Sequence, residues 1–295
     1  MSTPRITQRL ITAHSLSALQ TGLSRLSTTQ EQLSTGRTIN RPSDNPTGTN
    51  DAMRLRASLA AKGQYSRNAE DGTSWLNHAD STLTSMLGEV SRARDLILQG
   101  ASDGNNDASS RQALATELTQ IRAGLLDEAN TQHLGRPLFG GTTAGSAAYD
   151  SNGAFVGDTN DVNRTVGDGV TIPVNVTGPA AFSGGGTDLF SVLDDAISKL
   201  SSNSSAVTTN LDDLDAVAGS MRTALSTVGT RTNRIETATD ILDSTTLDTK
   251  AALSDVENVD IASAIVDLQM QEVAYQASLG ATSRVIQPSL MDFLK

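Results

Sequence analysis

The sequence predicts a mainly α-helical protein of long antiparallel helices, with N- and C-termini paired as a coiled coil and a small β-rich inserted domain. Three observations support this fold class. Apolar residues recur at alternating spacings of three and four at both ends of the 295-residue chain, which is the pattern of a narrow helical seam. Only 3% of the residues are aromatic, too few to anchor a large globular interior. Glycine, asparagine and aspartate gather in a central stretch where the helical pattern stops.

The first segment, from Pro4 to about Ser34, is expected to form one helix that ends at Gly36. The apolar row of this helix comprises Leu16, Leu19, Leu23, Leu26 and Leu33. Residues 41–48 follow with two prolines among serine, aspartate and asparagine, so they predict a turn. Because so narrow a row stabilises a helix only weakly, we expect the terminal helices to gain much of their stability from partners.

Helical patterning resumes near Asn50 and continues to about Gln99, and it returns from about Ser109 to Asn130. The polar residues 100–107 between them predict a loop. The expected buried residues of the two helices are Leu55, Leu59, Trp75, Leu76, Leu83, Met86, Leu87, Val90, Leu96 and Ile97, then Leu114, Leu118, Ile121, Leu125 and Leu126.

Between Leu138 and Gly186 the glycines are dense, and short alternating runs such as Val170–Val176 predict strands between turns. Beyond this insert, helices are expected from Asp188 to about Leu200 and from about Ala206 to Ala251.

The last helix is expected from about Val256 to Leu294, with Ser254 and Asp255 as its N-terminal cap. Its apolar row comprises Ile261, Ile265, Leu268, Tyr275, Leu279, Ile286, Leu290 and Phe293. Both ends of the chain therefore carry a seam, which favours association.

Charge is unevenly distributed along the chain. The net charge of −11 argues against nucleic acid as a partner, but residues 1–67 carry nine Lys or Arg against three Asp or Glu. The basic front part has two interpretations, either an ordinary solvated helix surface or attraction toward the acidic segment near the C-terminus.

No arrangement of residues predicts catalysis, a cofactor or a metal. The chain has no cysteine, and its histidines, His14, His78 and His133, stand isolated on different segments. The acidic stretch 158–168 lacks the alternate spacing of a calcium loop because Val162 interrupts it. No cleaved signal peptide and no membrane-spanning stretch are expected, so the chain is either cytosolic or exported without signal cleavage.

Three motifs carry a resemblance to a known family. Residues Leu33–Gly48 resemble the N-terminal signature of the bacterial flagellin superfamily, and Asp255–Lys295 resemble its C-terminal signature. Within this superfamily, Arg41–Asp44, Leu138–Thr142 and Ser289–Leu294 resemble the hook-filament junction branch more than filament flagellins.

The resemblance implies a secreted structural subunit that is not an enzyme and that forms a ring at the hook-filament junction of the extracellular flagellum. The implied partners are copies of itself, hook-associated protein 1, flagellin and a flagellar export chaperone. The implied domains are residues 1–40 and 253–295 as an inner coiled-coil layer, 41–137 and 187–252 as a helical rod, and 138–186 as the insert.

We therefore predict an assembly interface along the terminal helices, with Arg41, Pro42, Ser43, Asp44 and Asn45 as the connector between layers. The predicted contact residues are Leu16, Leu19, Leu23, Leu26, Leu33, Ile261, Ile265, Leu268, Leu279 and Ile286. The alternatives are a filament flagellin with a reduced middle domain, an unrelated cytosolic coiled-coil adaptor, and a hydrolase within the β-rich insert.

Overall fold

The computed structural model describes residues 3–102, 107–202 and 205–291, with side chains of residues 3–9, 11, 205–206 and 284–291 outside the description. The described chain is mainly helical, which confirms the predicted fold class. The helices are α1 (Thr3–Thr35), α2 (Pro46–Ala101), α3 (Ala108–Ala129), α4 (Gly178–Phe182), α5 (Leu189–Ser201), a 3-10 turn η1 (Ser205–Thr208), α6 (Thr209–Glu257) and α7 (Ile261–Met291).

The chain divides into two compact units. The terminal unit combines residues 1–60 with 246–295, and the central unit comprises residues 61–245. Helices α2 and α6 contribute residues to both units, so the division falls within helices and not in linkers. The five-part division expected from the sequence remains a prediction.

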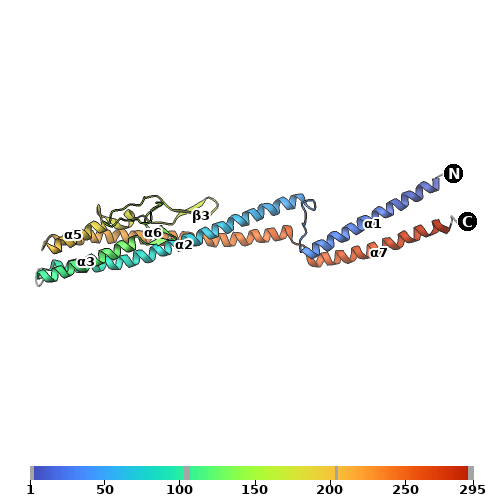
Figure 1. Cartoon of the computed structure of the whole chain (residues 1–295). Helices are drawn as coiled ribbons and strands as arrows, with labels where there is room; N and C mark the ends of the chain where they lie inside the picture. Colours follow the sequence, from blue (N-terminus) through green and yellow to red (C-terminus); the bar gives the residue numbers. More distant parts are fainter. Residues whose placement is uncertain (1–2, 103–106, 203–204, 292–295) are drawn as a thin grey trace. The chain divides into compact units, whose positions relative to one another are not determined.

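In the terminal unit, α1 and α7 run side by side in opposite directions, and Figure 1 shows the N- and C-termini at the same end of this pair. Backbone hydrogen bonds close the other end, where the Val259 amide donates to the Gly36 carbonyl at 3.1 Å and the Thr38 amide donates to the Glu257 carbonyl at 2.7 Å. Residues far apart in sequence are thereby joined into one hairpin of helices.

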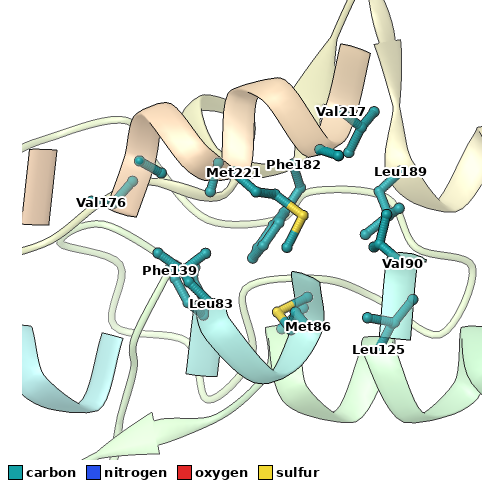
Figure 2. Close-up of a cluster of buried hydrophobic side chains, with 14 of the residues drawn as sticks. Leu83, Met86, Val90, Leu125, Phe139, Val176, Phe182, Leu189, Val217 and Met221 are labelled. Carbon is teal, nitrogen blue, oxygen red and sulfur yellow. The ribbon is translucent and has the colours of Figure 1, made fainter. Parts of the chain in front are cut away.

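In the central unit, the apolar faces of α2, α3, α5 and α6 meet the insert around one core. Figure 2 shows Leu83 and Met86 of α2, Leu125 of α3 and Met221 of α6 converging on Phe139 and Phe182. Most of the residues whose spacing predicts burial serve this core. Leu87 and Leu126 pack against it half-buried, and Leu55 and Leu59 are half-buried but do not belong to it.

The scarce aromatic residues are concentrated in this unit. Tyr149 packs edge-on against Phe155 and Phe190, with ring centroids 5.4 and 5.1 Å apart. Phe182 also contacts Tyr149, at 5.9 Å, and Phe139 joins the cluster through Phe182, at 4.9 Å. Few aromatics suffice because they are gathered at the insert, where helical periodicity gives no core of its own.

The described β structure comprises three two-stranded antiparallel hairpins. They pair β1 (Gln132–His133) with β2 (Arg136–Pro137), β3 (Asn163–Gly167) with β4 (Val170–Pro173), and β5 (Ser183–Gly184) with β6 (Thr187–Asp188). The first hairpin precedes the expected insert, and the strand predicted over Val170–Val176 ends at Pro173, because α4 soon follows. The β3–β4 hairpin is held on α2 by Arg164, whose Nε lies 2.6 Å from an Asp71 oxygen.

Three predicted helix boundaries are wrong. Helix α2 begins at Pro46 and not near Asn50, because the Asn45 side chain accepts from the Gly48 amide at 2.9 Å and proline suits a first helical position. Helix α6 continues to Glu257 and does not end near Ala251. The last helix therefore begins at Ile261 and not at Val256, and its expected end at Leu294 lies outside the described residues.

Candidate assembly interface

The seam between α1 and α7 is built from small and polar residues as well as leucines. Gly22 lies against Tyr275, since a Cβ added to this glycine would be 3.5 Å from the tyrosine ring. Two helical turns further along α1, the buried Thr29 hydroxyl lies 3.2 Å from the Gln271 side-chain oxygen. Such residues let the two helices approach closely without a large apolar core.

On α1, the seam and the predicted apolar row coincide only in part. Leu19, Leu26 and Leu33 are half-buried, whereas Leu16 and Leu23 are 56% and 51% exposed. The cause is helical geometry: Thr29 lies about 60° to one side of Leu26 and Leu23 about 60° to the other. Helix α7 covers the Thr29 side and leaves the Leu23 side uncovered.

The same division occurs on α7. Leu268 is half-buried, Ala264 is buried, and Ile261, Ile265 and Leu279 are exposed. Ile286 lies in α7, but its side chain is outside the description.

A second exposed apolar group, Val266, Met270 and Val273, lies on another face of α7. The search for large apolar residues at spacings of three and four did not identify these residues. It also missed the seam positions Gly22, Thr29 and Gln271. Gly22 and Thr29 follow the same spacing of seven, so a search for small residues at that period would have found them.

We call the exposed large apolar residues of this pair the outer rows, namely Leu10, Leu16, Leu23, Ile261, Ile265, Val266, Met270, Val273 and Leu279. Within the described chain nothing covers them. A set of this size on two paired helices exceeds the scattered apolar residues of an ordinary surface and is typical of a protein interface.

The predicted connector forms a compact turn between α1 and α2. The Asp44 carboxylate accepts from the backbone amides of Asn40 and Arg41 at 3.1 and 2.8 Å. Arg41 also reaches back to Glu31 of α1 at 3.4 Å, and Asn45 caps α2. Pro42 and Ser43 are exposed. Arg41, Asp44 and Asn45 therefore hold the turn through their contacts. Pro42 restricts its backbone while its side chain is exposed.

The end of α6 is tied to α2 by an ion pair. The Glu257 carboxylate is 9% exposed and lies 2.8 Å from the Arg56 guanidinium. The pair joins a basic residue of the front part to the acidic C-terminal segment, as the second interpretation of the charge distribution expects. Because the backbone carbonyl of Glu257 also accepts from the Thr38 amide, this residue ties α2 and α6 to the segment that follows α1.

Helix α7 begins after Asp260, which takes the capping role expected of Ser254 and Asp255. The Asp260 carboxylate accepts from the Ser263 hydroxyl at 2.8 Å and from the Ala262 amide at 3.0 Å. These hydrogen bonds, led by that of the Ser263 side chain, lower the pKa of Asp260.

The structure corrects the view that all three histidines stand alone. The rings of His78 and His133 lie 5.9 Å apart, and His133 also packs edge-on against Trp75 at 5.2 Å. Among the described residues, no group of three or more side chains could hold a metal ion. The pair is therefore a packing contact between α2 and β1.

The acidic stretch from Asp158 has a structural use. Asp158 accepts from the backbone amide and the hydroxyl of Thr142, both at 2.8 Å, and these bonds, the backbone one first, lower its pKa. Gly141, at φ +71°, passes so close to Asp158 that a Cβ would meet its carbonyl oxygen.

No helix in the described part of the chain has the length and apolar character needed to cross a bilayer.

Comparison with known families gives two matches. The model of the bacterial flagellin N-terminal helical region matches residues 6–144, and that of the bacterial flagellin C-terminal helical region matches residues 211–294. The two matches include both terminal helices, the connector and most of α2 and α6.

Similar proteins extend over nearly the whole chain. Flagellar hook-associated protein 3 of Escherichia coli is 27% identical over 90% of this chain and 92% of its own length. Flagellin of Bacillus subtilis is 24% identical over 93% of each. A crystal structure of flagellar hook-associated protein 3 from Legionella pneumophila shares the fold, with a TM-score of 0.63 and 15% identity over 69% of this chain and 98% of that one. The chain therefore belongs to the bacterial flagellin family.

Proposed function

We propose that this chain is the adaptor subunit that joins the hook-associated zone of the bacterial flagellum to the flagellin filament and provides the template on which the filament grows. Its family membership supports a structural role in the extracellular flagellum. The observation that carries the proposal is the pair of terminal helices whose outer rows stay uncovered within one chain.

The outer rows explain how a single copy would contribute to an assembly. Each copy closes its own seam through residues such as Gly22 and Tyr275, and it keeps Leu23 and Ile265 free for neighbours. Full burial of an exposed leucine or isoleucine stabilises by about 1.5 to 3 kcal/mol. These side chains are about half exposed, so each would gain a part of that free energy in a ring of copies.

The proposed partners are copies of this chain in a ring, hook-associated protein 1 on one side and flagellin on the other, with an export chaperone before secretion. Export would proceed through the flagellar apparatus without signal cleavage. No catalytic role is proposed, and the likeness to hook-associated protein 3 of Escherichia coli over nearly the full length of both chains favours the junction.

Filament flagellin with a reduced middle domain is the second candidate, favoured by the likeness to Bacillus subtilis flagellin over 93% of both chains. Deletion of the gene from its own cell separates the two. An adaptor predicts hooks without filaments and flagellin lost to the medium. Intact filaments after deletion would reject the adaptor, and self-polymerisation of the purified chain into long filaments would favour flagellin.

A further inference from the structure

The turn between β1 and β2 presents a leucine to solvent. Leu134 is 81% exposed and has a φ of +50°, and it is followed by Gly135 at φ +78°. A left-handed backbone is unfavourable for leucine, and asparagine or glycine is the usual residue at such a position. The described part of the central unit does not compensate for this backbone cost, because the Leu134 side chain is mostly in contact with solvent.

A groove on the same unit lies between α2 and α6, with a volume of about 550 Å³. Its lining includes the almost fully buried Ala69 together with Thr73 and Thr239, so methyl groups contribute to its floor. Glu70, Glu236 and Asp240 surround this floor, and none of the three has an ion pair among the described residues.

The leucine turn and the groove are complementary in charge. Arg136, two residues after Leu134, is exposed and likewise has no ion pair in the described part of the chain. A leucine flanked by a guanidinium suits an apolar floor edged by carboxylates, because the side chain would lose its contact with water while opposite charges face each other.

Leu134 is exposed and does not fill the groove of its own chain, which leaves the groove open to a side chain from another molecule. We propose that Leu134 of one copy enters the α2–α6 groove of a neighbouring copy, with Arg136 facing Glu70, Glu236 and Asp240. The two surfaces are different, so the contact is head-to-tail and repeats from copy to copy, as a ring or helical array requires. This proposal rests on the proposed function only in taking copies to stand side by side.

The direct test is a photocrosslink in assembled flagella. A photoreactive benzoylphenylalanine replaces Leu134 in the full chain, which keeps a bulky apolar group at the turn, and the chain is expressed in cells that lack the native gene. The control carries the same group at Val170, another exposed apolar residue on a hairpin of this unit. We expect a covalent dimer from position 134 alone, with the crosslinked peptide containing residues 69–77 or 236–240.

A charge exchange supplies the second measurement. Arg136→Glu and Glu236→Arg should each lower the yield of the dimer about threefold or more, and the double variant should restore it. A crosslink at position 134 to any other surface, or single variants without effect, would overturn the inference.

The backbone strain supplies a third variant that does not depend on the photoreactive group. Leu134→Asn should leave the melting temperature equal or higher, since asparagine tolerates a positive φ, while it reduces the number of chains incorporated per flagellum. Normal incorporation of Leu134→Asn would reject the leucine as an anchor. If the native chain is absent from flagella of cells that make normal filaments, the proposed function fails instead.

Discussion

At the scale of single residues, Tyr149 buries a polar group without a hydrogen-bond partner in the described chain. Its ring fills the aromatic cluster, but its hydroxyl is buried without a hydrogen-bond partner among the described residues, and burial raises the pKa of this phenol. Gly178 lies directly over the hydroxyl, since a Cβ there would come within 2.5 Å of it. The ring is therefore selected for its shape and not for its polar group.

Tyr149→Phe should accordingly raise the free energy of unfolding, by about 1 kcal/mol, because it removes an unsatisfied buried hydroxyl and keeps the ring. Chemical denaturation measures the change, with Tyr65→Phe on the half-buried Tyr65 as control. A clear loss of stability in Tyr149→Phe would mean that the hydroxyl is bonded.

At the end of α6, the buried Glu257 and the half-exposed Arg56 should respond differently to substitution. Arg56→Met leaves a buried carboxylate without its partner, so we expect a loss of about 1 to 3 kcal/mol in the terminal unit. Glu257→Gln removes the charge and keeps a hydrogen-bond acceptor, so its loss should be smaller. Thermal unfolding of the full chain ranks the two, and equal losses would show that the pair contributes through packing alone.

The stability that the Asp260 cap gives to α7 depends on pH, because the folded chain lowers the pKa of this carboxyl. Because hydrogen bonds from Ser263 and Ala262 lower the pKa of Asp260 below its ordinary value of 3.8, its contribution to stability is present above that value. This contribution disappears as the pH falls through the lower, folded-state pKa. An NMR titration should find the Asp260 carboxyl below 3.8 and closer to it in Ser263→Ala, which removes the largest cause. A pKa unchanged by Ser263→Ala would contradict the assignment.

At the scale of elements, the pairing of α1 with α7 divides one apolar row into residues that pack in the seam and residues that stay exposed. Leu26 is half-buried at the seam, and Leu23 is exposed beside it. The spacing of three and four could predict the row but not its division, because the choice of covered side depends on Gly22 and Thr29 meeting residues more than 200 positions away.

These two leucines form a matched pair for substitution. Leu26→Asp places a charge in the seam, so it should reduce the helical content of the monomer and move its melting to lower temperature. Leu23→Asp should leave both unchanged and act only on assembly. Circular dichroism of the two full chains measures the difference, and an equal loss of helix in both variants would contradict the division of the row.

Helices were predictable from sequence where a long periodic face meets a core, as in α2, α3 and α5. The β structure was less predictable, because its strands are short and gain their place from contacts such as that of Arg164 with Asp71. The boundaries near Asn45 and Asp260 were missed because several adjacent polar residues could each cap a helix. The caps that form are local hydrogen bonds from the Gly48 amide to Asn45 and from the Ala262 amide to Asp260.

At the scale of the whole molecule, the two units of the chain differ in how much apolar surface they bury. The central unit has its own core, whereas the terminal unit closes a thin seam and leaves the outer rows uncovered. Assembly through those rows would explain why the terminal unit exposes so many apolar side chains.

The most direct measurement is complementation of cells that lack the gene, scored by electron microscopy as the fraction of hooks that bear filaments. The native chain should restore filaments, and Leu23→Asp, exported and folded to the same extent, should leave hooks bare and release flagellin into the medium. Filaments restored equally by Leu23→Asp and by the native chain would contradict the claim that the outer rows are the assembly surface.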